Sequence, residues 1–213
     1  AAYGVSVENL KVTYDEGETI TYPNFTIKPG EKVLLTGDSG TGKSTLFKAL
    51  LGKIETKCGK ITYFDKESQP ITNAKLGYLP QDPIVFPISI KDNITMFVKR
   101  TEKQLMNVVK NVELKSDLDK MPSGIDTVVN LKKNNLSGGQ RQKIVLARSE
   151  IYNQPFVLMD EVTSAIDQKA TEEIITALLK TDQTILMIAH NFTPELRAKF
   201  DQEIRLAKKG EEE

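Results

Sequence analysis

The chain has 213 residues, which is enough for one large domain or for a core with one inserted subdomain. Basic and acidic side chains number 29 each, and this balance argues against a basic nucleic-acid-binding face or a polybasic membrane contact. The one cysteine, Cys58, excludes an internal disulfide, and the absence of any run of about 18 apolar residues excludes a membrane-spanning helix in this sequence.

The first part of the chain predicts mostly strands. Residues 5–14 alternate apolar and polar positions, which is typical of a half-buried strand. Residues 19–37 predict two more strands around a turn at Pro29-Gly30. After a glycine-rich stretch, residues 44–52 predict a helix closed by Gly52. Short strands are predicted at 59–64 and 75–81.

Helices dominate the middle of the chain, from about 88 to 152. Thr101 and Gln104 have the spacing of a capping box at the start of a helix. That helix would bury one face, formed by Leu105, Val108, Val109 and Val112. Residues 138–153 predict another helix, which ends before Pro155.

Two continuous apolar runs near the end of the chain, 156–160 and 184–190, are typical of buried parallel strands. A helix between them would bury Ile174, Ile175, Leu178 and Leu179. Alternating strands and helices predict an α/β fold with a mostly parallel sheet, preceded by an antiparallel β part. We therefore expect one domain over 1–213, with a core at about 1–87 and 153–213. A helical subdomain would occupy about 88–152.

The glycine-rich stretch between the predicted strand and the predicted helix matches the phosphate-binding P-loop pattern, G-x4-G-K-S. Its residues are Gly37, Asp38, Ser39, Gly40, Thr41, Gly42, Lys43, Ser44 and Thr45. Glycines let backbone N–H groups wrap phosphates, and the start of the helix adds its positive dipole end. Lys43 would reach the β- and γ-phosphates, and the Ser44 hydroxyl would bind Mg²⁺.

Two acidic residues end the apolar run 156–160. Asp160 at the end of a buried strand would point toward the metal of the nucleotide, as the corresponding acid does in P-loop nucleoside triphosphatases. Glu161, one residue further, can act on an attacking water as a general base. A solvent-exposed carboxylate is the structural alternative for Glu161.

A second small-residue segment, LSGGQ at 136–140, matches the signature of ATP-binding cassette (ABC) ATPases. Over roughly 3–207 the chain resembles their nucleotide-binding domain, with the motifs in the family's order. These are Tyr14, the P-loop at 37–45, Gln81 in GYLPQD, the signature, the Walker B run 156–161, SAID at 164–167 and His190.

The resemblance implies a role for each matching residue. Tyr14 would stack on adenine, although a tyrosine on a strand face is an alternative reading. Gln81 would contact Mg²⁺ or the lytic water and sense a transmembrane partner. His190 would contact the γ-phosphate and help Glu161 to hold the water. Asp167 would contact a facing subunit.

The resemblance also implies that the signature serves a second nucleotide-binding domain. Ser137, Gly139 and Gln140 would contact the nucleotide held by the P-loop of the facing domain. Two such domains, identical or different, would enclose two Mg-ATP molecules. Hydrolysis would then release the two domains from each other. A helix start preceded by small residues suits this use, because it offers N–H groups and a dipole without side-chain bulk.

The segment after Gln81 resembles that of ABC exporters, as does GIDTVV at 124–129. The segment 129–135 departs from the exporter pattern, because it lacks the acid and the glycines of the loop that contacts the membrane domain. We expect the ATPase domain of an exporter at the cytoplasmic face of the cell membrane, with the membrane domain in the same full-length chain. A separate subunit is the alternative. The alternatives are a soluble ABC ATPase of translation or DNA repair, or a regulatory cassette that does not hydrolyse ATP.

Overall fold

The computed structural model describes residues 1–14 and 17–207, which form two compact units. The first unit contains residues 1–78, 155–160 and those from 182 onward. The second contains residues 79–154 and 161–181. The fold is mixed α/β, with an antiparallel sheet, a parallel sheet and helices, as the sequence predicts.

The antiparallel sheet of the first unit is built around its first strand. Strand β1 (Gly4–Tyr14) pairs with three others, and Val5 lies opposite both Ile27 and Tyr63. The pairing with β5 shifts register between Glu8 and Lys11. The partners are β2 (Glu18–Thr21), β3 (Phe25–Ile27) and β5 (Cys58–Phe64), and β6 (Pro70–Ile71) follows β5.

The second sheet of this unit is parallel over four neighbouring strands. Its order is β10 (Gln202–Leu206), β4 (Lys32–Gly37), β9 (Thr184–Ile188), β8 (Phe156–Asp160) and β7 (Gly77–Leu79). Every residue of β9 and the first four of β8 are buried. Continuous apolar runs are expected for strands that are covered on both faces. The predicted strand at 156–160 is therefore confirmed with its bounds.

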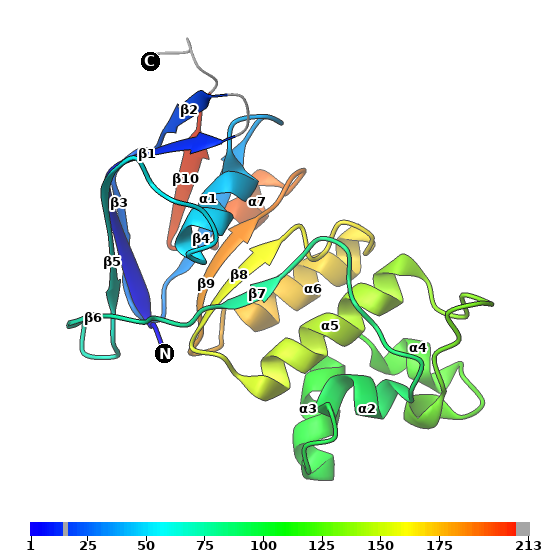
Figure 1. Ribbon diagram of the computed structural model, residues 1–213. Helices are drawn as coiled ribbons and strands as arrows, with labels where there is room; N and C mark the ends of the chain where they lie inside the picture. The colour runs from blue at the N-terminus through cyan, green and yellow to red at the C-terminus, as the bar shows by residue number, and fades with distance from the viewer. Residues whose placement is uncertain (15–16, 208–213) are drawn as a thin grey trace. The chain divides into compact units, whose positions relative to one another are not determined.

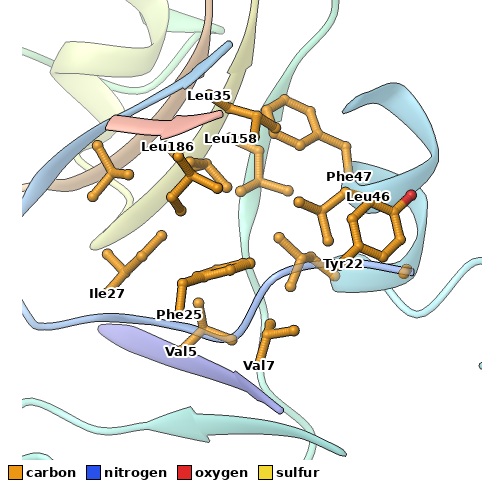
Figure 2. Packing of buried hydrophobic residues seen from close by; sticks show 14 of the residues in the cluster. Val5, Val7, Tyr22, Phe25, Ile27, Leu35, Leu46, Phe47, Leu158 and Leu186 are labelled. Carbon is orange, nitrogen blue, oxygen red and sulfur yellow. The ribbon is translucent and has the colours of Figure 1, made fainter. Parts of the chain in front are cut away.

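The core of the first unit lies where the two sheets and helix α1 (Lys43–Leu50) meet (Figure 2). Val5 and Val7 project into it from the antiparallel sheet, and Leu46 and Phe47 from α1. The parallel sheet contributes Leu35, Leu158 and Leu186. Because α1 is anchored through this core, the loop that precedes it is held at the end of β4.

The second unit is helical (Figure 1). Its helices are α2 (Ile90–Thr95), α3 (Glu102–Asn111), α4 (Lys115–Asp119), a 3-10 turn η1 (Gly124–Asp126), α5 (Gly138–Tyr152) and α6 (Gln168–Leu178). Helix α3 has the predicted capping box between Thr101 and Gln104 and buries its predicted apolar face. Helix α5 ends at Asn153, which takes a left-handed conformation before Pro155.

Some sequence predictions about individual elements are wrong. The stretch 19–37 holds three strands, because β2 and β3 both pair with β1 whereas β4 joins the other sheet. The strand at 75–81 shortens to β7, and the run 184–190 leaves the sheet after Ile188. Leu179 is only partly buried because it lies at the C-cap of α6.

Helix α1 ends as predicted, with Gly52 in a left-handed conformation just beyond it. The remaining short helix, α7 (Pro194–Arg197), belongs to the first unit. Within 1–14 and 17–207, no helix is long and apolar enough to cross a membrane.

Candidate functional site

The carboxyl ends of three neighbouring parallel strands meet at one edge of the sheet in the first unit. Leu35 of β4 pairs with Ile188 of β9, which in turn pairs with Asp160 of β8. Gly37 at the start of the P-loop therefore lies two residues beyond this row, and His190 lies two residues beyond it, after the end of β9. Ligands of open α/β sheets bind at this edge.

Two of the three P-loop glycines, Gly37 and Gly42, lie where side chains would not fit. A Cβ atom on Gly37 would come within 2.5 Å of the carbonyl oxygen of Leu206. One on Gly42 would lie 2.6 Å from Cδ1 of Ile20, and Gly42 also has a φ of 96°. The loop backbone thus follows its neighbours closely, which leaves its N–H groups on a surface without side-chain bulk.

Lys43 starts helix α1 and lies largely buried beneath the loop. Its Nζ donates to the carbonyl oxygens of Gly37 and Asp38, the second at 3.0 Å. Thr41 closes the loop, because its hydroxyl donates to the Asp38 carbonyl oxygen at 2.8 Å. No acidic residue lies in the first turn of α1, so the dipole end of the helix is not neutralised there.

Two tyrosines near the loop were not predicted from the sequence. The Tyr22 hydroxyl donates to the carbonyl oxygen of Gly42 at 2.7 Å, and so ties the P-loop to the segment after β2. Tyr78 of β7 packs its ring edge-on against Phe47 of α1. Burial raises the pKa of Tyr78, and the charge of Asp160 adds to this effect. Nothing in the sequence next to these tyrosines identifies a partner that lies 20 or more residues away.

The acidic pair at the end of β8 is divided between the units. Asp160 ends the strand in the first unit and is partly exposed. Glu161 belongs to the second unit and has a φ of 50°, a left-handed conformation that is uncommon outside glycine. Such strained residues gather at active sites.

His190 is exposed and lines a cavity of about 240 Å³ in the first unit. Gly37 and Asp38 of the P-loop line the same cavity, as do Arg197 and Arg205. Arg197 is already paired, since its guanidinium donates to Glu203 at 2.7 and 2.8 Å. The cavity thus places the imidazole beside the start of the P-loop.

The signature segment begins helix α5 in the second unit. Ser137 is the N-cap, and its hydroxyl oxygen accepts from the backbone N–H of Gln140 at 3.1 Å. In turn, Oε1 of Gln140 accepts from the backbone N–H of Ser137, and Nε2 of Gln140 donates to Asp117 at 3.0 Å. Asp117 accepts from Lys143 at 2.9 Å as well. Gln140, predicted to contact nucleotide, is therefore engaged within its own unit.

The remaining predicted residues lie at or beyond the ends of regular elements. Gln81 follows β7, belongs to the second unit and is exposed. Asp167 caps α6 by accepting the backbone N–H of Ala170 at 2.9 Å. Tyr14 ends β1, but its side chain lies outside the described part of the structure.

The residues at the P-loop suit a nucleoside triphosphate with Mg²⁺. Bulk-free backbone, a buried ammonium and a helix start are the donors that phosphates require. The Ser44 hydroxyl and the Asp160 carboxylate are hard oxygen ligands. Among the described residues no cluster of three acidic, histidine or cysteine side chains could hold a metal alone. Mg²⁺ usually takes one or two protein ligands together with water and phosphate oxygens.

Fold and site together define a P-loop nucleoside triphosphatase domain. The family model described as "ABC transporter" matches residues 20–164, which is more than half of the chain. The chain belongs to the ABC transporter family, and its mixed α/β fold is that of the family's nucleotide-binding domain.

Curated relatives are similar over most of the chain. A mesentericin transport/processing ATP-binding protein from Leuconostoc mesenteroides is 35% identical over 85% of this chain. A multidrug resistance-like ATP-binding protein from Buchnera aphidicola is 34% identical over 91%. The chain spans 26% and 35% of their respective lengths.

A solved structure of a bacterial Atm1-family ABC exporter with ATP bound superposes with a TM-score of 0.81 at 26% identity. The superposition covers 97% of this chain and 38% of the exporter chain. These likenesses are to transport proteins, and they give no support to the alternative of a translation or DNA-repair ATPase.

Proposed function

We propose that the chain is the ATP-hydrolysing motor domain of an ABC exporter. The observation that carries the proposal is the row formed by Leu35, Ile188 and Asp160. It supports a site in which a phosphate-binding loop and a metal-binding acid meet at one sheet edge. Membership of the ABC transporter family supports ATP as the nucleotide.

Different groups of the chain bind different parts of Mg-ATP in this proposal. The N–H groups of residues 37–45 and the Lys43 ammonium hold the phosphates. Ser44, Asp160 and Gln81 hold Mg²⁺, which neutralises charge on the β- and γ-phosphates when it is bound. Tyr14 stacks on the adenine ring.

Glu161 is the proposed general base, and it takes a proton from the attacking water. His190 contacts the γ-phosphate and orients the same water. The exposed position of His190 beside Gly37 and Asp38 supports this assignment.

The catalytic unit is proposed to be a dimer of two nucleotide-binding domains. Ser137 and Gly139 at the start of α5 contact the nucleotide in the P-loop of the facing domain, and Asp167 contacts that domain. Gln140 supports the same surface through its bonds to Ser137 and Asp117.

Coupling to a membrane domain completes the proposal. The chain spans only part of its relatives, and those relatives are named as transport proteins. We infer that it works at the cytoplasmic face of a membrane and drives export. The transmembrane partner is either part of the same polypeptide or a separate subunit.

Three forms of the chain test the proposal together. The wild-type chain should hydrolyse Mg-ATP. Glu161→Gln should lower kcat at least about a hundredfold while it retains ATP, because only the base is lost. Light scattering should then detect an ATP-dependent dimer. Lys43→Ala is the matched control and should lose ATP binding and, with it, dimerisation. A Glu161→Gln chain that stays monomeric in saturating Mg-ATP would contradict the dimeric site.

A further inference from the structure

Gln142 lies on α5, two residues beyond the signature segment, and is buried, with 4% of its surface exposed. A buried carboxamide needs partners for its oxygen and for its nitrogen, since an unsatisfied polar group in the interior is costly. Both atoms find their partners in one short segment, 161–165, which follows the strand that carries Asp160.

The contacts of Gln142 are specific. Its Oε1 accepts from the backbone N–H of Ala165 at 2.9 Å. Its Nε2 donates to the Ser164 hydroxyl at 3.0 Å and to the backbone carbonyl oxygen of Glu161 at 3.3 Å. One side chain of the signature helix thus holds both ends of the segment that begins with Glu161.

The segment needs such support because Glu161 has a left-handed backbone with a φ of 50°. A non-glycine residue keeps this conformation only where its surroundings hold it. The Gln142 bond reaches the carbonyl of that very residue.

A second, independent contact joins the same two segments. Gly139 packs so closely on residue 165 that an added Cβ would lie 2.7 Å from the carbonyl oxygen of Ala165. The start of α5 and segment 161–165 therefore touch through backbone at one point and are bonded through Gln142 at another. All of these residues lie in the second unit, so the connection is internal to it.

We propose that Gln142 is a positioning residue that holds the Glu161 carboxylate and the signature segment as one body. The inference rests on the proposed function, in which Glu161 activates water at the chain's own nucleotide and the signature contacts the nucleotide of the facing domain. Gln142 then links the two nucleotide sites through a single chain.

Substitutions at Gln142 separate positioning from packing. Gln142→Met keeps the length of the side chain but removes all three hydrogen bonds. Gln142→Glu keeps shape and the acceptor for Ala165, but it places a carboxylate oxygen against the carbonyl of Glu161. Asn111→Ala is the control, because it removes a bond to Glu150 at the far end of α5.

Steady-state hydrolysis and direct ATP binding are the first measurements. Both Gln142 variants should lose about ten- to a hundredfold in kcat, as expected for a displaced catalytic group. Their affinity for ATP should remain within about twofold of wild type, because the P-loop residues are untouched. Asn111→Ala should retain kcat. Wild-type kcat in both Gln142 variants, or an equal loss in the control, would overturn the proposal.

Amide hydrogen exchange tests the same idea without any activity. In nucleotide-free Gln142→Met, the Ala165 N–H should exchange faster than in wild type, whereas exchange in the middle of α5 should not change. Unchanged exchange at Ala165 would overturn the inference. A wild-type chain that hydrolyses no ATP would contradict the proposed function, and Ala165 exchange would still decide whether Gln142 holds the segment.

Discussion

At the scale of single residues, the predicted P-loop residues lie on the elements expected for them. Gly37 and Gly42 occupy positions where a Cβ would collide with Leu206 or Ile20. Lys43 lies under the loop, at the start of α1. The pattern could be read from the sequence because the P-loop glycines also have positive φ angles, a local requirement that favours glycine whatever the distant neighbours are.

His190 provides a test at this scale. His190→Ala should lower kcat about a hundredfold with little change in ATP affinity, because the proposed γ-phosphate contact is one of many that hold the nucleotide, whereas the water depends on the imidazole for its orientation. Stopped-flow phosphate release and equilibrium ATP binding measure the two effects. Arg205→Gln, a change in the same cavity wall, is the control and should leave kcat within about twofold. Unchanged turnover in His190→Ala would remove this residue from the site.

At the scale of elements, the local sequence of helix α5 determines its range, whereas tertiary contacts determine its partners. The sequence predicted its range, and the capping box of Ser137 and Gln140 explains where it begins. The sequence did not predict that Gln140 and Lys143 both bind Asp117, or that Gln142 holds segment 161–165. Those partners are about 20 residues or more distant, and no local periodicity specifies them.

The contact between α3 and α5 carries a prediction about pH. Burial raises the pKa of the Glu150 carboxyl, and the hydrogen bond from Asn111 Nδ2 at 2.5 Å partly opposes this. The folded chain therefore binds the proton more tightly than the unfolded chain. The ionised carboxylate destabilises the fold at neutral pH, and this penalty fades as the pH falls through the raised pKa.

Glu150→Gln removes that penalty while keeping an oxygen to accept from Asn111. We expect Tm to rise by about 2–4 °C at about pH 8. The gain should shrink at acidic pH, as wild-type Glu150 takes up its proton on the fall through its raised pKa. Thermal unfolding followed by circular dichroism measures both values. Glu173→Gln, an exposed change on α6, should show no such pH-dependent difference. A gain that is equal at both pH values would contradict the assignment.

At the scale of the whole molecule, the proposed function makes the catalytic site a shared property of two chains. The P-loop and His190 belong to the first unit, and the signature and Glu161 belong to the second. If the signature serves a facing domain, catalysis depends on an encounter between two chains.

That dependence can be measured directly. The rate of hydrolysis per chain should rise with chain concentration and then level off as the dimer saturates, because association is governed by mass action. A dilution series at saturating Mg-ATP is sufficient. A rate per chain that stays constant from the lowest concentration upward would contradict a dimeric catalytic unit.

The sequence by itself determined the class of this protein. The glycine-rich loop between strand and helix, the buried run 156–160 with its terminal acids and the order of the motifs all depend on neighbours along the chain. Backbone geometry and burial constrain such short stretches directly, so the residue pattern can be recognised in the sequence alone.

Only the tertiary structure decided which distant residues meet. It separated β3 and β4 into different sheets, aligned Leu35 with Ile188 and Asp160, and brought Tyr22 to Gly42 and Gln142 to Glu161. The physical reason is that strand register and helix packing are set by the whole core. A buried glutamine or tyrosine has the same local pattern whatever partner the fold supplies.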